Sequence, residues 1–409
     1  MHSLDAFRGF DIAAMLLVNL TWNEQVFHRQ LFHVDWNASA QGATFTDLVF
    51  PWFLFIAGAA IPLSMDSGRG QSQTGSEKIR TAFRRSVVLY FLGVLLTVAG
   101  SYFDRPAQWT DVFRWNVLQL IAWGYFTAVC VFLLPRRAQF GFVVVVLLGK
   151  WLLLAGLPYD VVSEPFSPRA TGATSTQGPG TFHHFDSVKR FVAAEHRPGS
   201  LLDRILGWFG MWQQVLPCAA LAVLGGLTTR RLRRQHDQPS ETEFRRASAR
   251  NAAHVAVLGL GLTLLGFLLQ WNYDPAGGGL WGTWTVPFSK WLFSPAYVLL
   301  AAGTGMLLYS AFFVWIDLLR WSSGRVLRVF GLNAIALYLA AELSFKVLWT
   351  RWQMHGPDGS SQSWMSGTQA WLTAWLGQAP GLWMHVVLYL CLWWLFCWWL
   401  DRKDWHLKV

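Results

Sequence analysis

An apolar run that opens with a single carboxylate decides the fold of this chain: residues 46–58 read TDLVFPWFLFIAG. The apolar stretch extends over residues 45–65, and an α-helix of about 20 residues crosses about 30 Å of hydrocarbon. Its acid, Asp47, stands where the membrane span would begin. Ionisable groups inside a membrane segment are candidates for function. We therefore expect a transmembrane helix with chemistry at its first turn.

The composition predicts a membrane protein. Of 409 residues, 53% are hydrophobic and only 14% are charged, whereas soluble domains carry about 25% charged residues. Apolar runs long enough to cross a bilayer occur at residues 9–22, 45–65, 84–103, 114–134, 139–157, 205–228, 252–271, 292–317, 326–349 and 381–401. Residues 367–376 could form a further partial helix. We predict an all-α fold, a polytopic integral membrane bundle of about ten transmembrane helices.

Lysine and arginine are concentrated in every second connection between these runs. The basic connections contain Arg69, Lys78, Arg80, Arg84 and Arg85, then Arg136 and Arg137, then the arginines between 230 and 250, then Arg320, Arg325 and Arg328. By the positive-inside rule this alternation places both termini in the cytoplasm. The net charge of +10 is then a topology signal that also suits anionic lipid, and we expect no nucleic-acid partner.

The chain is expected to form one integral membrane domain over residues 1–409. The long outer loop at 158–204 could cap a site, and the charged segment 229–251 is a cytoplasmic linker between two halves. The chain runs directly into its first apolar segment, so we expect no cleavable signal peptide. The tryptophan-rich final run could be a lipid belt or the interface of a homodimer.

The sequence predicts neither a metal site nor one of the common hydrolase active sites. The four cysteines, Cys130, Cys218, Cys391 and Cys397, all fall inside apolar runs, where they act as small buried hydrophobic residues. The pair His183 and His184 has no third ligand nearby. The sequence also contains no nucleophilic serine elbow, HExxH, Walker loop or GxGxxG before a helix.

His33 is the best candidate for a general base or nucleophile. It lies in a short segment between the first two apolar runs, and a carboxylate such as Asp47 behind an imidazole is typical of general-base sites. The alternative is that His33 is an interfacial loop residue and Asp47 a helix N-terminal acid. Asn19, near the outer end of the first run, could hold a substrate carbonyl or cross-link helices.

Further polar groups occur at both ends of the predicted spans. Arg114, Gln119 and Lys290 begin spans from the outer side and could converge with Asn19 and His33. At the inner side, Asp5, Arg8 and Asp11 are spaced three apart, so they line one side of the first helix. Arg8 either belongs to a salt-bridged helix start or meets a phosphate of a cytosolic cofactor. Asn333 and Glu342 lie deeper, with Lys346 as a partner for Glu342.

Several motifs resemble the heparan-α-glucosaminide N-acetyltransferase family, which contains lysosomal acetyltransferases and their bacterial relatives. The motifs are LDAFRG at 4–9, Val18-Asn19, His33-x-x-Trp36-Asn37, the 46–58 run, Val117-Leu118-Gln119, Ser294-x-x-Tyr297 and Asn333-x-Ile335-x-x-Tyr338. The most specific part covers about 60 residues at the start of the chain.

The resemblance implies a transmembrane acyltransferase of the bacterial inner membrane. Such an enzyme would move an acetyl group from cytosolic acetyl-CoA to an amino sugar or glycan on the outer side. The family's active histidine corresponds to His33 and its catalytic asparagine to Asn19, and we add Asp47 as the partner of His33. The candidate contacts of acetyl-CoA are Asp5, Arg8, Gln119 and Asn333. The candidate contacts of the acceptor are Trp36, Arg114 and Lys290.

The sequence leaves alternatives open. His33 could act as a base or accept the acetyl group itself, and the acceptor could be an amine or a hydroxyl. A different class of function is a proton-coupled transporter or flippase of a sugar or lipid-linked glycan, with His33 and Asp47 as a proton relay. An inactive scaffold of an envelope assembly is a third reading, which would tolerate replacement of both His33 and Asn19.

Overall fold

The structure, a computed structural model, describes most of the chain. It describes residues 1–34, 42–104, 116–156, 212–233, 240–272, 279–286, 288–290, 293–321, 324–349 and 351–407. The predicted outer cap at 158–204 lies outside these residues. The helices before and after the predicted linker 229–251 extend into both of its ends, since one ends at Leu232 and the next begins at Glu241.

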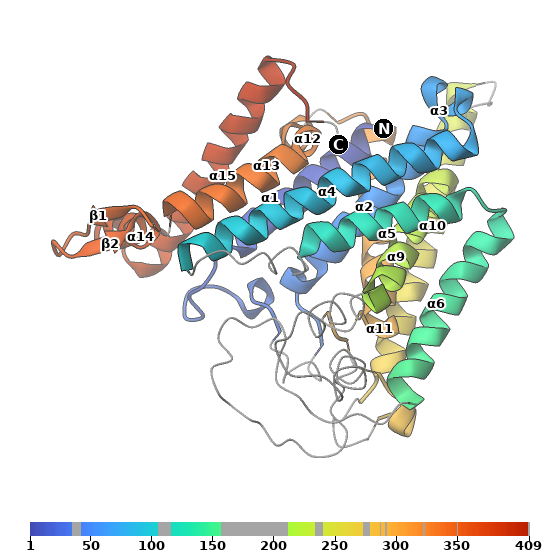
Figure 1. Cartoon of the computed structure of the whole chain (residues 1–409), viewed down its shortest axis with the longest axis horizontal. Helices are drawn as coiled ribbons and strands as arrows, with labels where there is room; N and C mark the ends of the chain where they lie inside the picture. Colours follow the sequence, from blue (N-terminus) through green and yellow to red (C-terminus); the bar gives the residue numbers. More distant parts are fainter. Residues whose placement is uncertain are drawn as a thin grey trace.

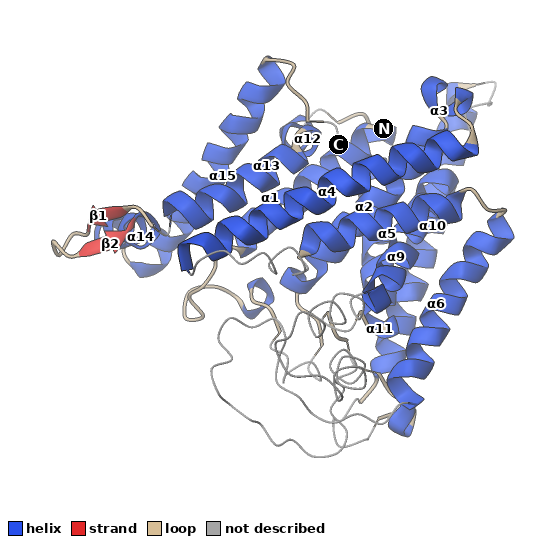
Figure 2. Ribbon diagram, in the orientation of Figure 1, coloured by secondary structure: helices blue, strands red, loops and turns tan. Residues whose placement is uncertain are grey.

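Helices make up most of the described chain, and the one sheet in it is a short antiparallel hairpin (Figure 2). The first half contains α1 His2–Val18, η1 Arg29–Leu31, α2 Phe45–Met65, α3 Gly68–Ser72, α4 Gly75–Asp104, α5 Val117–Phe132 and α6 Arg136–Gly156. The second half contains α9 Trp212–Leu232, α10 Glu241–Gln270, η4 Gly282–Trp284, α11 Pro295–Phe312, η5 Phe313–Leu318, α12 Gly324–Leu332, α13 Ala334–Ser344, η6 Phe345–Trp349, β1 Gln353–His355, β2 Ser361–Ser363, α14 Trp364–Leu376 and α15 Gln378–Arg402.

The predicted helical fold is confirmed, and fewer helices than the ten predicted spans meet a strict test for crossing a membrane. Among the described residues, six helices are long and apolar enough to cross a membrane, or seven if the bent pair α12–α13 is one span. Each predicted run overlaps one helix or, at 326–349, the bent pair α12–α13, but α1, α5 and α6 are not among the six. α1 has 17 residues and α5 has 16, shorter than a perpendicular crossing needs. Ten spans therefore stay a prediction.

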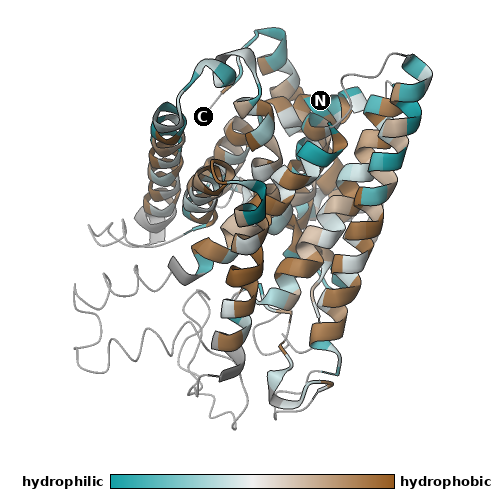
Figure 3. Ribbon diagram, turned by 90° about the vertical axis from the view of Figure 1, so that its right-hand side faces the viewer, coloured by the Kyte–Doolittle hydropathy of each residue, from teal (hydrophilic) through white to brown (hydrophobic). Residues whose placement is uncertain are grey.

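Both ends of the chain lie at the same end of the bundle, together with α3 (Figure 1). Hydrophobic residues follow the lengths of the long helices, and hydrophilic residues gather at the end where the termini lie (Figure 3). This is the arrangement expected of an even number of crossings. The cytoplasmic location of that end remains a prediction from the basic connections.

The core of the bundle is formed by α2, α9 and α11. The buried share of the apolar window is 61% in α2, 78% in α9 and 67% in α11, but only 22% in α10. α10 exposes leucine and valine side chains such as Val257 and Leu264. Because hydrocarbon solvates these side chains well, an exposed apolar face is the expected surface of a helix that contacts lipid.

Two helix crossings depend on the absence of a side chain. A Cβ on Gly58 of α2 would lie 1.9 Å from the carbonyl oxygen of Ala222 in α9. A Cβ on Gly9 of α1 would lie 1.7 Å from the carbonyl oxygen of Leu327 in α12. Small residues let membrane helices approach backbone to backbone, which is how their association is stabilised without a hydrophobic driving force.

The predicted span at 326–349 is broken. α12 and α13 meet at an angle of 72°, and Asn333 stands between them with φ −118° and ψ 29°. Asparagine has a low helix propensity, and α12 is held against α1 just before the break, at the Gly9 crossing. The sequence predicted one span here, and we attribute the bend to this tertiary contact. The break directs α13 toward the site described below.

Replacing Gly58 with alanine should lower the free energy of unfolding by about 2 kcal/mol or more, because the new methyl group meets backbone that must shift. The measurement is thermal unfolding of the purified protein in lipid discs. Gly141→Ala in α6 is the matched control, since nothing lies within 4 Å of its Cβ position. Equal unfolding temperatures for the two variants would contradict the close crossing of α2 and α9.

Candidate functional site

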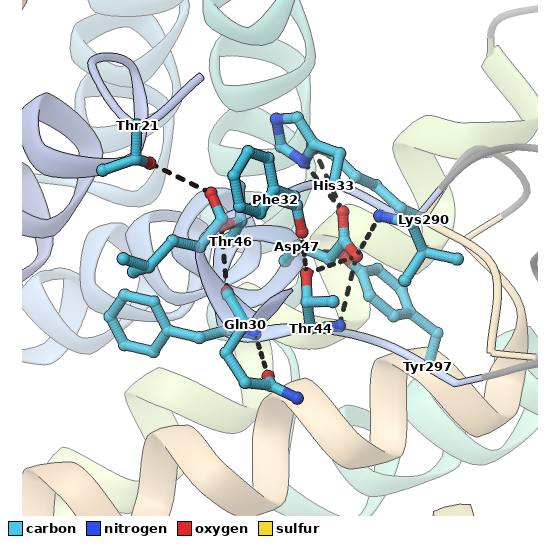
Figure 4. A network of polar contacts seen from close by, with 12 residues as sticks. Thr21, Gln30, Phe32, His33, Thr44, Thr46, Asp47, Lys290 and Tyr297 are labelled. Atoms are coloured by element: carbon cyan, nitrogen blue, oxygen red, sulfur yellow. Dashed lines mark hydrogen bonds and ion pairs between the residues drawn. The ribbon is translucent and has the colours of Figure 1, made fainter. Parts of the chain in front are cut away.

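The carboxylate of Asp47 is the centre of a polar network at the first turn of α2 (Figure 4). Its Oδ2 accepts hydrogen bonds from the backbone N of Thr44 at 3.2 Å and from the Thr44 hydroxyl at 2.9 Å. It also accepts one from the backbone N of Val34 at 3.2 Å. Thr44 precedes α2 and Asp47 is the third residue into the helix, which is the capping-box spacing. Asp47 is therefore a capping acid as well as a candidate site residue.

His33 contacts the other oxygen of the same carboxylate. Its Nδ1 lies 2.9 Å from Asp47 Oδ1, while its side chain is 54% exposed. Because a carboxylate accepts, this contact favours the tautomer with the proton on Nδ1 and a lone pair on Nε2. Figure 4 shows the second ring nitrogen directed away from Asp47. The predicted pairing of His33 with Asp47 is confirmed, and it leaves a nitrogen suited to accept a proton from a reactant.

Lys290 reaches the same network from the segment before α11. Its Nζ lies 3.2 Å from His33 Nδ1 and 3.9 Å from Asp47 Oδ1. Burial lowers the pKa of Lys290 from its ordinary value, and the Asp47 carboxylate counters part of that effect. α11 is held nearby, since the hydroxyl of buried Tyr297 donates to the carbonyl oxygen of Asp47 at 2.5 Å. Segments from both halves of the chain thus meet at Asp47.

A cavity of about 160 Å³ joins this network to the first helix. Its walls come from α1, α2, α5 and α13 and are mostly apolar. Its polar lining residues are Asp11, Asn19, His33, Thr46, Lys290, Tyr338 and Glu342. The predicted candidates Asn19, His33 and Lys290 therefore share one cavity, although they are distant in the sequence. An apolar pocket with a few convergent polar groups is the usual form of a ligand site.

Asn19 is held by the broken span. Its Nδ2 donates to Glu342 Oε1 of α13 at 3.4 Å. Lys346 follows one turn later in η6, and its Nζ lies 3.9 Å from Glu342 Oε2 and donates to the carbonyl oxygen of Leu96 at 3.2 Å. The expected Glu342–Lys346 pair is thus confirmed. The contact with Glu342 orients the amide of Asn19, because a carboxylate can only accept, and it accepts from the NH₂ group.

The inner-side candidates are arranged differently from the cavity residues. Arg8 Nη1 lies 3.4 Å from Asp5 Oδ1 and donates to the carbonyl oxygen of Gly331 at 3.5 Å. The salt-bridged helix start is therefore present, and neither Arg8 nor Asp5 lines the cavity. Both side chains remain partly exposed, 25% and 29%.

Gln119 and Asn333 are buried and do not line the cavity. Gln119 Oε1 accepts from the backbone N of Asn116 at 2.6 Å, and Asn116 Oδ1 accepts from the backbone N of Leu118 at 2.9 Å. Gln119 is thus part of the cap of α5. Asn333 lies at the break of the ninth predicted span, and its amide atoms have no partner among the described residues. Trp36 and Arg114 lie outside the described residues.

Four residues of the site were given no catalytic or binding role from the sequence: Thr44, Tyr297, Glu342 and Asp11. Tyr297 was noted only in a family motif, Glu342 only as a partner of Lys346, and Asp11 only on the inner side of the first helix. Thr44 could have been recognised from its spacing, because a threonine three residues before an acid at the start of an apolar run is a capping-box pattern. Tyr297 and Glu342 are brought in by tertiary contacts over more than 200 residues, for which the sequence contained no local signal. Among the described residues no group of histidine, cysteine and acid side chains could hold a metal ion.

Comparisons with known proteins find similarity in the N-terminal part of the chain. Residues 1–162 match the family model of heparan-alpha-glucosaminide N-acetyltransferase, catalytic. The human heparan-alpha-glucosaminide N-acetyltransferase is 35% identical over 137 residues, which is 33% of this chain and 19% of the human protein. The mouse protein of the same name is 35% identical over 129 residues, 31% of this chain and 18% of its own length. The matched segment thus spans about a fifth of these relatives, and the resemblance noted in the sequence is confirmed.

Replacing Asp47 with asparagine should lower the free energy of unfolding by about 2 kcal/mol, because an amide nitrogen cannot accept the hydrogen bonds that this buried carboxylate receives. Thermal unfolding in lipid discs measures the change. Asp358→Asn is the control, since that carboxylate also accepts from Ser360 but on an exposed turn, where little change is expected. An unchanged unfolding temperature for Asp47→Asn would show that the network does not stabilise the fold.

Proposed function

We propose that this integral membrane protein is an acetyltransferase. It moves an acetyl group from cytosolic acetyl-CoA to an amino sugar or glycan on the other side of a bacterial inner membrane. The observation that carries the proposal is that Asn19 and His33, the positions of the family's catalytic pair, line one cavity. The Asp47 carboxylate lies 2.9 Å behind the imidazole. The names of the matched relatives supply the reaction class.

The residues fit a direct transfer. His33 Nε2 accepts a proton from the acceptor amine as the amine nitrogen attacks the thioester carbonyl carbon. The second N–H of the Asn19 amide donates to the carbonyl oxygen as negative charge develops there. The carbon–sulfur bond then breaks, and the imidazolium returns its proton to the CoA thiolate. The products are an acetamide and free CoA. Asp47 stabilises the imidazolium through Nδ1 and is a positioning residue.

The chemical character of the cavity lining suits acetyl-CoA as a co-substrate. The walls of the cavity are mostly apolar and its polar lining includes Asn19 and His33, which suits an extended arm that ends in a thioester. The phosphates would be bound at the inner surface, where Arg8 and the basic connections of the chain lie. Trp36, Arg114 and Lys290 remain candidates for the acceptor, and Gln119 and Asn333 remain candidates for acetyl-CoA. Transfer through an acetylated His33 is the alternative route.

His33→Ala should abolish acceptor-dependent release of CoA, because the variant has no base at the acceptor, while CoA binding should persist. The measurement is CoA release from acetyl-CoA by the purified protein in lipid discs, with a panel of amino sugars and glycans. His355→Ala, on the exposed β1, is the control and should retain full activity. Retained activity in His33→Ala would remove His33 from the mechanism. Sugar movement driven by a pH gradient without acetyl consumption would favour the transporter.

Glu342→Leu should lower kcat about 100-fold with a small change in KM for the acceptor, because the Asn19 amide loses the acceptor that orients it. Glu342→Gln retains an oxygen at the same position and should recover most of the rate. Steady-state kinetics of both variants in lipid discs test the role. If Glu342→Gln were as impaired as Glu342→Leu, the charge of Glu342 rather than the orientation of Asn19 would be required.

A further inference from the structure

Asp11 is a buried acid that the mechanism above does not use. It is 1% exposed on α1, and neither oxygen of its carboxyl group has a hydrogen-bond partner among the described residues. Asp47 is similarly buried, at 3%, but its carboxylate receives four hydrogen bonds. A buried polar group without a partner costs free energy. Asp11 also lines the cavity, so a ligand in that cavity can supply the missing partner.

The position of Asp11 specifies where that ligand would lie. Asp11 and Asn19 both line the cavity, as does Met15 between them. They are spaced by four residues each, so they share one face of α1. Eight residues of α-helix span about 12 Å. Nearby Arg8 does not satisfy Asp11, since its guanidinium binds Asp5 and the carbonyl of Gly331.

The ligand that this cavity fits is therefore long and mostly apolar along its length. One end contacts Asn19, and a hydrogen-bond donor lies far enough from that end to reach Asp11. Most other lining residues are apolar, such as Ile12, Val49 and Ile335. The pantetheine arm of a CoA thioester has this form. It carries the thioester at one end, then two secondary amides, and beyond them a hydroxyl beside two methyl groups.

We propose that Asp11 binds the pantetheine arm of acetyl-CoA by accepting a hydrogen bond from the distal amide N–H or the hydroxyl of that arm. The inference rests on the proposed function and extends it to a residue that none of the sequence motifs contained. Asp11 does not take part in acetyl transfer. In the empty protein the unpartnered carboxyl group of Asp11 lowers the stability of the fold. The hydrogen bond from the arm compensates this loss when the arm enters the cavity.

The test compares binding in the full chain in lipid discs, with Asp11→Leu and Asn251→Leu as matched isosteric variants. Asn251 of α10 is 4% exposed, has an unpartnered Nδ2 and does not line the cavity. We expect Asp11→Leu to weaken acetyl-pantetheine binding about tenfold in calorimetry. S-acetyl-N-acetylcysteamine, which lacks the distal amide and hydroxyl, should bind both proteins equally. Asn251→Leu should bind both ligands as the wild type does.

A second readout separates a binding residue from a structural one. The unfolding temperature of the ligand-free Asp11→Leu protein should equal or exceed that of the wild type, because an unpartnered polar group has been removed. A lower unfolding temperature of Asp11→Leu, together with equally weakened binding of both ligands, would show that Asp11 has a structural role and would overturn the inference. Unchanged acetyl-pantetheine binding in Asp11→Leu would overturn it and leave the proposed function intact. A wild-type protein that binds neither ligand nor CoA would overturn both.

Discussion

The buried carboxylate of Asp47 is the interaction on which the site depends. It satisfies backbone N–H groups at the start of α2 and before it, and it contacts the side chains of His33 and Lys290. An anionic acceptor at a helix N-terminus is stabilised by the helix dipole as well as by these donors. One group thus does two tasks: it caps a membrane helix and it fixes the orientation of an imidazole. The two interpretations that the sequence left open, helix cap or partner of His33, are compatible, because the capping bonds go to Oδ2 and the His33 contact is made by Oδ1.

The positions of the cavity walls follow from close helix crossings. In a bilayer, helices gain little from burying apolar surface against one another, so small residues that admit backbone contact decide which helices pair. The crossing at Gly58 joins α2 to α9, and the crossing at Gly9 joins α1 to α12. With α12 held in this way, the bend at Asn333 carries α13 to the cavity. Glu342 can then accept from Asn19.

Asp11 of α1 and Asp47 of α2 are both buried acids, but they differ in their hydrogen-bond partners. Asp47 is satisfied by the protein, so it stabilises the fold and positions His33. Asp11 is not satisfied within the described chain, so it weakens the empty fold and is available to a ligand. Residues that lower stability in the empty protein are expected at binding sites, because the ligand supplies the missing interactions. Burial alone does not distinguish these two roles, whereas the hydrogen-bond partners do.

The sequence was sufficient for features that depend on local composition. Runs of apolar residues must be helical in hydrocarbon, since only internal hydrogen bonds satisfy the backbone there, and every predicted run does contain helix, although the run at 326–349 contains two bent against each other. The pairing of His33 with Asp47 could also be predicted, because a short segment separates them. The break at Asn333 and the contacts of Asn19 with Glu342 and of Asp47 with Tyr297 were decided only by the tertiary structure. They join residues far apart in the chain, and such contacts depend on how whole helices pack rather than on any local pattern.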